Sequence, residues 1–155
     1  RWVRRGARGP RLMGDAPAAG QGAKAEVTVR LTVPFHDCDP LAIVWHGRYL
    51  EYFEQARAEL FIGFGLDVPE IRTLGYRMYV VDVRCRYTHP LSYGDVVEVT
   101  ARLKAARPLI RVVYTVRNAT RQRTSARGHC VLATTDAAGA LFYETPDAIF
   151  DRLPR

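Results

Sequence analysis

The sequence predicts an α+β protein in which an antiparallel β-sheet wraps around one long α-helix. A single long helical pattern begins near residue 48, and its apolar side chains recur at helical spacing at Tyr49, Leu50, Phe53, Ala56, Leu60 and Phe64. Most later segments instead alternate apolar and polar residues with a period of two, as strands do. Because sequential strands joined by short turns pair antiparallel, we expect their sheet to cover the apolar stripe of the helix.

In the first half of the chain, the ends of the elements carry clear signals. Residues 26–34 alternate as a first strand, and the long helix that follows is expected to end at Gly63 and Gly65. Asp67 is placed to cap a short helical turn that has Pro69 in its first turn.

The second half predicts strands joined by tight turns, at residues 77–90, 97–103, 110–117, 123–135 and 141–143. One face of the first of these strands is expected to carry Tyr79, Val81, Val83, Cys85 and Tyr87. Residues 123–135 have apolar side chains on both faces, which predicts a central strand or a covered outer surface. A last helix is expected from Thr145 through Leu153.

Length and composition indicate one ordinary globular domain over residues 25–155. The chain has 155 residues, of which 48% are hydrophobic and 25% charged, and no run approaches the ~18 apolar residues of a membrane span. Cys38, Cys85 and Cys130 show no paired spacing and no secretory signal precedes them, so we expect a reducing, cytoplasmic location. The histidines form no ligand pattern with these cysteines, and we expect neither a metal nor a cofactor.

The net charge of +7 is concentrated in the first 24 residues. This segment holds six Lys and Arg residues and one Asp, a net of +5, in a Gly-, Ala- and Pro-rich context that predicts a disordered tail. Met13 is a candidate first residue of the natural protein, so residues 1–12 are a candidate expression or gene-start artefact. The remainder of the chain carries only +2, so we expect no nucleic-acid partner.

The segment before the long helix carries the candidate chemistry. Asp37 and Asp39 lie in a tight loop, and the helix that follows presents unpaired backbone N–H groups and a positive dipole end near His46 and Gly47. Taken alone, this pattern is more typical of a turn with a side-chain cap than of a catalytic carboxylate. Asp37 is expected to hold the loop through backbone bonds.

The motif from Asp37 to His46, followed by Tyr49 and by Glu54-Gln-Ala-Arg57, resembles the 4-hydroxybenzoyl-CoA thioesterase family of acyl-CoA hydrolases. A looser match extends over residues 87–95. The resemblance implies a hot-dog fold, in which a five- or six-stranded antiparallel sheet wraps around one helix, with active sites at a dimer interface. An exposed edge strand independently favours a homodimer or homotetramer.

By this resemblance, the protein is an acyl-CoA thioesterase with Asp39 as nucleophile or general base. Backbone N–H groups near His46 and Gly47 would polarise the thioester carbonyl. Trp45 and Tyr49 become candidates for contacting the acyl group, and Arg107 for contacting CoA phosphates. Two departures are Leu41-Ala42, where many members carry Ala-Gly or Gly-Gly, and a less basic run around Arg107.

Several alternatives stay open at this point. Glu54 is a second candidate carboxylate, because another branch of hot-dog thioesterases uses a helix glutamate, although an ion pair with Arg57 is equally expected. Cys38 beside His36 could be a nucleophile, but a lone cysteine is more often a small buried hydrophobe.

Other functions on the same fold are also open. The carrier could be acyl carrier protein rather than CoA, and the chain could be a non-catalytic binding subunit. Hot-dog dehydratases carry His-Phe-Pro or Asp-x-x-x-x-His loops, which the sequence lacks.

Overall fold

A computed structural model describes residues 24–154, so the predictions about the basic tail fall almost entirely outside the described residues. A short 3-10 turn, Phe35–Asp37, precedes the long helix. The other elements, in chain order, are β1 (Glu26–Thr32), α1 (Arg48–Gly63), α2 (Val68–Thr73), β2 (Tyr76–Tyr87), β3 (Val96–Ala105), β4 (Ile110–Asn118), β5 (Arg123–Asp136), β6 (Leu141–Phe142) and α3 (Asp147–Phe150).

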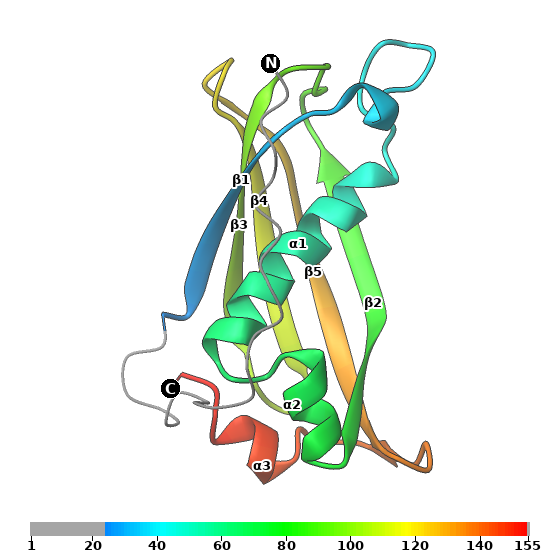
Figure 1. Ribbon diagram of the computed structural model, residues 1–155, viewed down its shortest axis with the longest axis vertical. Helices are drawn as coiled ribbons and strands as arrows, with labels where there is room; N and C mark the ends of the chain where they lie inside the picture. Colours follow the sequence, from blue (N-terminus) through cyan, green and yellow to red (C-terminus); the bar gives the residue numbers. More distant parts are fainter. Residues whose placement is uncertain (1–23, 155) are drawn as a thin grey trace.

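The described residues form one six-stranded antiparallel sheet, curved around α1 (Figure 1). The strand order is β1-β3-β4-β5-β2, and β6 pairs with the end of β5. The predicted α+β class and the hot-dog arrangement are therefore confirmed. β5 lies between β4 and β2, which explains why its sequence is apolar on both faces. No helix within residues 24–154 is long and apolar enough to cross a membrane.

The core lies between α1 and the concave face of the sheet. Alternate residues of β3 and β4, such as Val99 and Val112, are fully buried there, as their period of two predicts. The Phe53 ring of α1 stacks on Tyr114 of β4, with ring centroids 4.3 Å apart. The predicted helix stripe is wrong at Leu50, which is 39% exposed, whereas Tyr52 is buried.

Two further element predictions need correction. The pairing of β2 with β5 shifts register between Val80 and Asp82, a β-bulge that reverses the alternation. Tyr79 therefore lies on the opposite face of the sheet from Val83, although the sequence places them on one face. The last helix, expected to run through Leu153, ends at Phe150, because Leu153 turns into the core after a single short helical segment.

Candidate active site

Asp37 anchors the loop before α1 through its side chain as well as through the backbone bonds that the sequence predicted. The carboxylate is 5% exposed, and its Oδ2 accepts a 2.6 Å hydrogen bond from the Tyr52 hydroxyl. Nitrogens of Arg48 and His36 both lie 3.4 Å from Oδ1. The Asp37 carbonyl oxygen also accepts a bond from the Trp45 N–H. These contacts hold both ends of the loop against α1.

Asp39 lies in a turn that engages one of its two carboxylate oxygens and leaves the other able to accept a hydrogen bond. Its Oδ1 accepts a 2.8 Å hydrogen bond from the Leu41 N–H, and its carbonyl oxygen accepts one from the Ala42 N–H. Oδ2 has no hydrogen-bond partner within residues 24–154. Ala42 has a φ of 61°, a left-handed conformation that glycine adopts without strain and that alanine adopts at a cost of about 1–2 kcal/mol. The turn predicted as an alternative is formed, and it orients the carboxylate.

Asp39 opens onto a groove of about 390 Å³. The groove is bounded on one side by the loop and the first turn of α1, and on the other by the chain that continues β2. Its lining residues are Asp39, Leu41, Ile43, Val44, His46, Tyr49, Tyr87, Thr88, His89 and Pro90. The structure thus brings together three of the predicted site residues, Asp39, His46 and Tyr49. Most of the remaining lining is apolar, as suits an acyl group.

The start of α1 lies beside this groove, which His46 lines and Gly47 does not. Gly47 occupies the N-cap position without a side-chain cap. In the described part of the chain, the N–H groups of His46 and Gly47 donate no backbone hydrogen bond. Both groups belong to the positive end of a 16-residue helix. The His46 carbonyl accepts a 2.8 Å bond from the Tyr87 hydroxyl, which joins the two walls of the groove.

Trp45, which the sequence predicts to contact the substrate, is not among the residues that line the groove. Its ring instead lies against Gly47, where an added Cβ would be 2.2 Å from a ring carbon. Gly47 has ordinary helical angles, so the close approach of Trp45, rather than backbone conformation, explains the glycine. The Trp45 ring thereby covers Gly47, the last residue before α1.

Glu54 and Arg107, the other two candidates, lie outside the groove. Glu54 is exposed on the outer face of α1, and the expected ion pair with Arg57 is absent from residues 24–154. Arg57 turns inward instead, 3.7 Å from the sulfur of buried Cys130. Arg107 pairs with Asp147 and stacks on the Phe150 ring, at 4.1 Å.

Sequence reasoning missed the second wall of the groove, at Tyr87 and His89. A signal was present, because these residues fall in the looser motif over residues 87–95, but only strand pairing shows that they face Asp39. The Tyr87 ring packs edge-on against Tyr49, with centroids 4.9 Å apart. Burial raises the pKa of Tyr49 to about 12, so its hydroxyl stays protonated at neutral pH.

Comparison with known proteins places this arrangement among thioesterases. A protein from Aquifex aeolicus is 36% identical over 75 residues, which make up 48% of this chain and 59% of that relative. The acyl-CoA thioesterase YbgC of Helicobacter pylori is 30% identical over 96 residues, covering 59% of this chain and 69% of YbgC. The matched part of the chain therefore spans less than two thirds of the length of the Aquifex relative.

A solved structure matches more of the chain. The crystal structure of a hypothetical protein from Aquifex aeolicus has a TM-score of 0.73 and 26% identity, and the match covers 82% of this chain and 98% of that one. The family model described as the thioesterase-like superfamily matches residues 33–153, which include the loop, α1 and the whole groove. The chain therefore belongs to the thioesterase-like superfamily.

Proposed function

We propose that the protein hydrolyses acyl-CoA thioesters in the groove beside Asp39. The observation that carries this proposal is that the Asp39 carboxylate, with Oδ2 unpaired within residues 24–154, lines one apolar groove together with His46 at the start of α1. A thioester needs an activated nucleophile and donors for its carbonyl oxygen, and its thiolate leaves without further help. Membership of the thioesterase-like superfamily supports the same reaction.

In this reaction the substrate carbonyl oxygen accepts hydrogen bonds from the helix-start N–H groups. Each such donor is worth about 3 kcal/mol in comparable sites. Asp39 either removes a proton from water that attacks the carbonyl carbon, or attacks it directly to form an anhydride that water then cleaves. In both routes the C–S bond breaks, and the products are a carboxylic acid and CoA.

The narrower assignment to the 4-hydroxybenzoyl-CoA thioesterases rests on the motif from Asp37 to His46. The aromatic faces of Tyr49 and Tyr87 in the groove favour an aroyl or other apolar acyl group. Similarity to YbgC, named an acyl-CoA thioesterase, supports CoA as the carrier, with acyl carrier protein as the alternative. The three cysteines within residues 24–154 are all free, which fits the proposed cytoplasmic location.

The proposed active form is a homodimer joined along β2. Within the described chain, this 12-residue strand pairs with β5 alone, so its other edge has free backbone groups. Val81 is 57% exposed and Val83 43% exposed along this edge, an arrangement that monomers normally avoid. An antiparallel strand pairs with its own copy about a two-fold axis, which makes the edge self-complementary. Pairing of two such dimers would give the alternative homotetramer.

The test is release of thiol from a panel of aroyl- and acyl-CoA substrates. Asp39→Asn should lower kcat by at least roughly 100-fold while the oligomeric state is unchanged. Asp151→Asn is the matched control, since Asp151 is an exposed aspartate outside the groove. Equal turnover in the wild type and Asp39→Asn would contradict the role of Asp39. Binding of acyl-CoA without turnover would instead favour a non-catalytic binding subunit.

A further inference from the structure

The outer face of the sheet, which points away from α1, carries an excess of positive charge. In each strand the residues of this face alternate with the inward-facing ones, and the strand register places them beside one another. Among these register-paired residues, the charged side chains are three carboxylates, at Glu26, Asp82 and Glu98, and eight guanidinium groups, at Arg30, Arg77, Arg84, Arg86, Arg102, Arg111, Arg117 and Arg127. With histidine counted as neutral, the face has a net charge of +5, although residues 24–154 together carry only +2. The rest of the described chain is therefore net negative.

Ion pairs neutralise one side of this face. Carboxylate oxygens of Glu98 lie 3.7 Å from a nitrogen of Arg30 and 3.3 Å from a nitrogen of Arg117. A carboxylate oxygen of Glu26 lies 4.0 Å from a nitrogen of Arg102. These pairs cover β1, β3 and the end of β4. The cations without a carboxylate are concentrated on the other side of the face, over β5 and β2.

Three exposed arginines on β2 and β5 form what we call the arginine cluster: Arg84, Arg86 and Arg127. Within residues 24–154 none of them has a carboxylate partner, because Asp82, on the same face of β2, contacts His129 instead, at 3.3 Å. Arg86 and Arg127 are direct cross-strand partners, and Arg84 is two residues, or about 7 Å, along β2 from Arg86. Like charges directly opposite each other destabilise a sheet. The cluster therefore costs stability that an anionic partner would restore.

The side chains of the outer face narrow the class of this partner. Protein interfaces are anchored by buried aromatic or other large apolar side chains, and single-stranded nucleic acids stack on aromatic rings. None of the large apolar side chains exposed within residues 24–154 belongs to β1, β3, β4 or β5. The long helix, which could enter a groove of duplex DNA, lies on the opposite side of the sheet (Figure 1). An anionic lipid surface needs no such element, since its charge acts over a Debye length of about 10 Å.

We propose that the outer face of the sheet docks the protein on an anionic lipid membrane, with the arginine cluster as the centre of attraction. Lipid phosphates accept charge-assisted hydrogen bonds from guanidinium groups, and their array adapts to cations spread over a curved surface. None of the three arginines lines the groove beside Asp39. The inference therefore goes beyond the proposed hydrolysis and does not depend on it.

Co-sedimentation with lipid vesicles measures this docking. The full chain should bind vesicles of phosphatidylglycerol and phosphatidylcholine in equal amounts, should not bind phosphatidylcholine alone, and should be released by added salt. Arg86→Thr/Arg127→Thr should weaken binding about 10- to 50-fold, as expected for two cations close to an anionic surface. Every variant retains the first 24 residues, so a difference between variants reports the sheet alone. An affinity equal to that of the wild type would overturn the proposal.

Stability measurements separate lost docking from lost folding. Because threonine favours strands and the like-charge pair is removed, Arg86→Thr/Arg127→Thr should be at least as stable as the wild type in urea denaturation. Arg86→Lys/Arg127→Lys retains both charges and should bind anionic vesicles nearly as well as the wild type. A lysine variant that is folded but binds as weakly as the threonine variant would overturn docking by charge.

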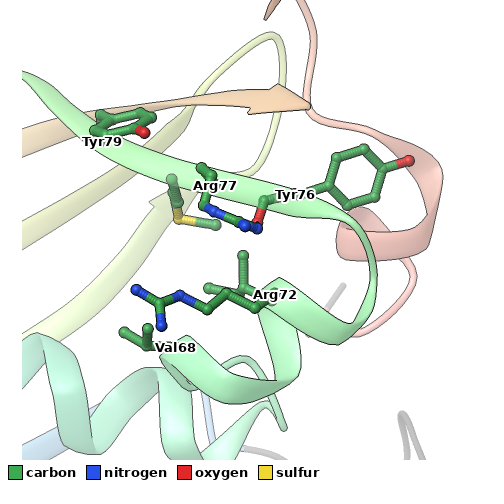
Figure 2. Close-up of a pocket in the computed structure, with 7 residues that line it drawn as sticks. Val68, Arg72, Tyr76, Arg77 and Tyr79 are labelled. Carbon is green, nitrogen blue, oxygen red and sulfur yellow. The ribbon is translucent and has the colours of Figure 1, made fainter. Parts of the chain in front are cut away.

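A control variant removes two charges from elsewhere. Figure 2 shows Arg72 on α2, beside a pocket of about 210 Å³ between this helix and the start of β2. Arg107 is engaged by Asp147 and Phe150. Arg72→Ala/Arg107→Ala therefore lowers the net charge by the same amount without changing the outer face, and it should bind vesicles nearly as well as the wild type. An equal loss of affinity in both double variants would show a response to net charge alone and would overturn the assigned face.

Two other occupants of the cluster are distinguishable outcomes. Tight binding of a DNA duplex through the arginine cluster, without binding to anionic vesicles, would overturn the membrane assignment. So would a raised KM for acyl-CoA in Arg86→Thr/Arg127→Thr with unchanged vesicle binding, because the cluster would then contact CoA phosphates. Vesicle binding needs no turnover, so it should be unaltered in Asp39→Asn. The docking can therefore fail while hydrolysis is confirmed, or be confirmed while hydrolysis fails.

Discussion

The Tyr52 hydroxyl donates a 2.6 Å hydrogen bond to Oδ2 of Asp37, and both residues are buried. Burial, and then the bond to Asp37, raises the pKa of Tyr52 above its usual value. This bond ties the second turn of α1 to the loop that carries Asp39. The position of the candidate catalytic carboxylate therefore depends on a tyrosine that does not line the groove.

Removing this bond should lower stability. We expect Tyr52→Phe to reduce the free energy of unfolding by about 1–3 kcal/mol, because it leaves a buried carboxylate oxygen without its partner. Urea denaturation provides the measurement, and Tyr143→Phe is the control, since Tyr143 is 85% exposed. A Tyr52→Phe protein as stable as the control would contradict the anchoring role of Asp37.

Gly47→Ala should displace the Trp45 ring without unfolding α1. An added Cβ would lie 2.2 Å from that ring, which is half-exposed and can move away. We expect a shift in tryptophan fluorescence and a stability loss of at most about 1 kcal/mol. Gly63→Ala is the comparison, because a Cβ there meets nothing within 4 Å, and it should be neutral or slightly stabilising. An unchanged fluorescence spectrum in Gly47→Ala would argue against the contact.

Gly128→Ala should be much more damaging. A Cβ at this position would lie 2.3 Å from the Arg84 carbonyl oxygen and 2.7 Å from the Phe53 ring. Since the carbonyl belongs to the paired backbone of β2, it has little freedom to move. We expect a loss of about 2–3 kcal/mol, typical of an overpacked core, with a lower Tm in thermal unfolding. Adding Phe53→Leu should restore only part of the loss, and complete rescue would show that the ring alone limits the site.

The ionisation of Tyr49 should weaken the fold at high pH. Burial raises its pKa from 10.0 to about 12, so between these values the unfolded chain releases a proton that the folded chain retains. The stabilisation is fully present below pH 10 and is lost as the pH rises toward 12, by up to about 3 kcal/mol. The free energy of unfolding, measured from pH 9 to 12, should therefore fall less steeply with pH in Tyr49→Phe than in the wild type. Parallel curves for the two proteins would contradict a buried, protonated Tyr49.

Much of the fold could be predicted because the signals are local. The period of two in β3 and β4 follows directly from which side chains face α1. The bulge between Val80 and Asp82 could not be predicted, since a bulge is set by pairing with β5 and changes no residue type. Burial of Tyr52 in place of Leu50 likewise depends on Asp37, which lies 15 residues away.

The candidate site could be predicted in part for the same reason. Asp39 and His46 belong to one continuous segment, whereas the opposite wall at Tyr87 reaches it only through the sheet. Spacing on a helix predicted that Glu54 pairs with Arg57. The structure gives Arg57 a buried thiol as its neighbour instead, a long-range contact that no helical spacing encodes.

Buried Asp95 holds together the segment from which the far wall of the groove extends. Its Oδ2 accepts a 2.7 Å hydrogen bond from the Asn118 amide, and its carbonyl accepts one from the Val33 N–H. The neighbouring Leu91 carbonyl accepts a bond from the Val44 N–H, across the groove. Both walls are therefore formed in the absence of a ligand. Little conformational entropy is lost in ordering them when a substrate binds.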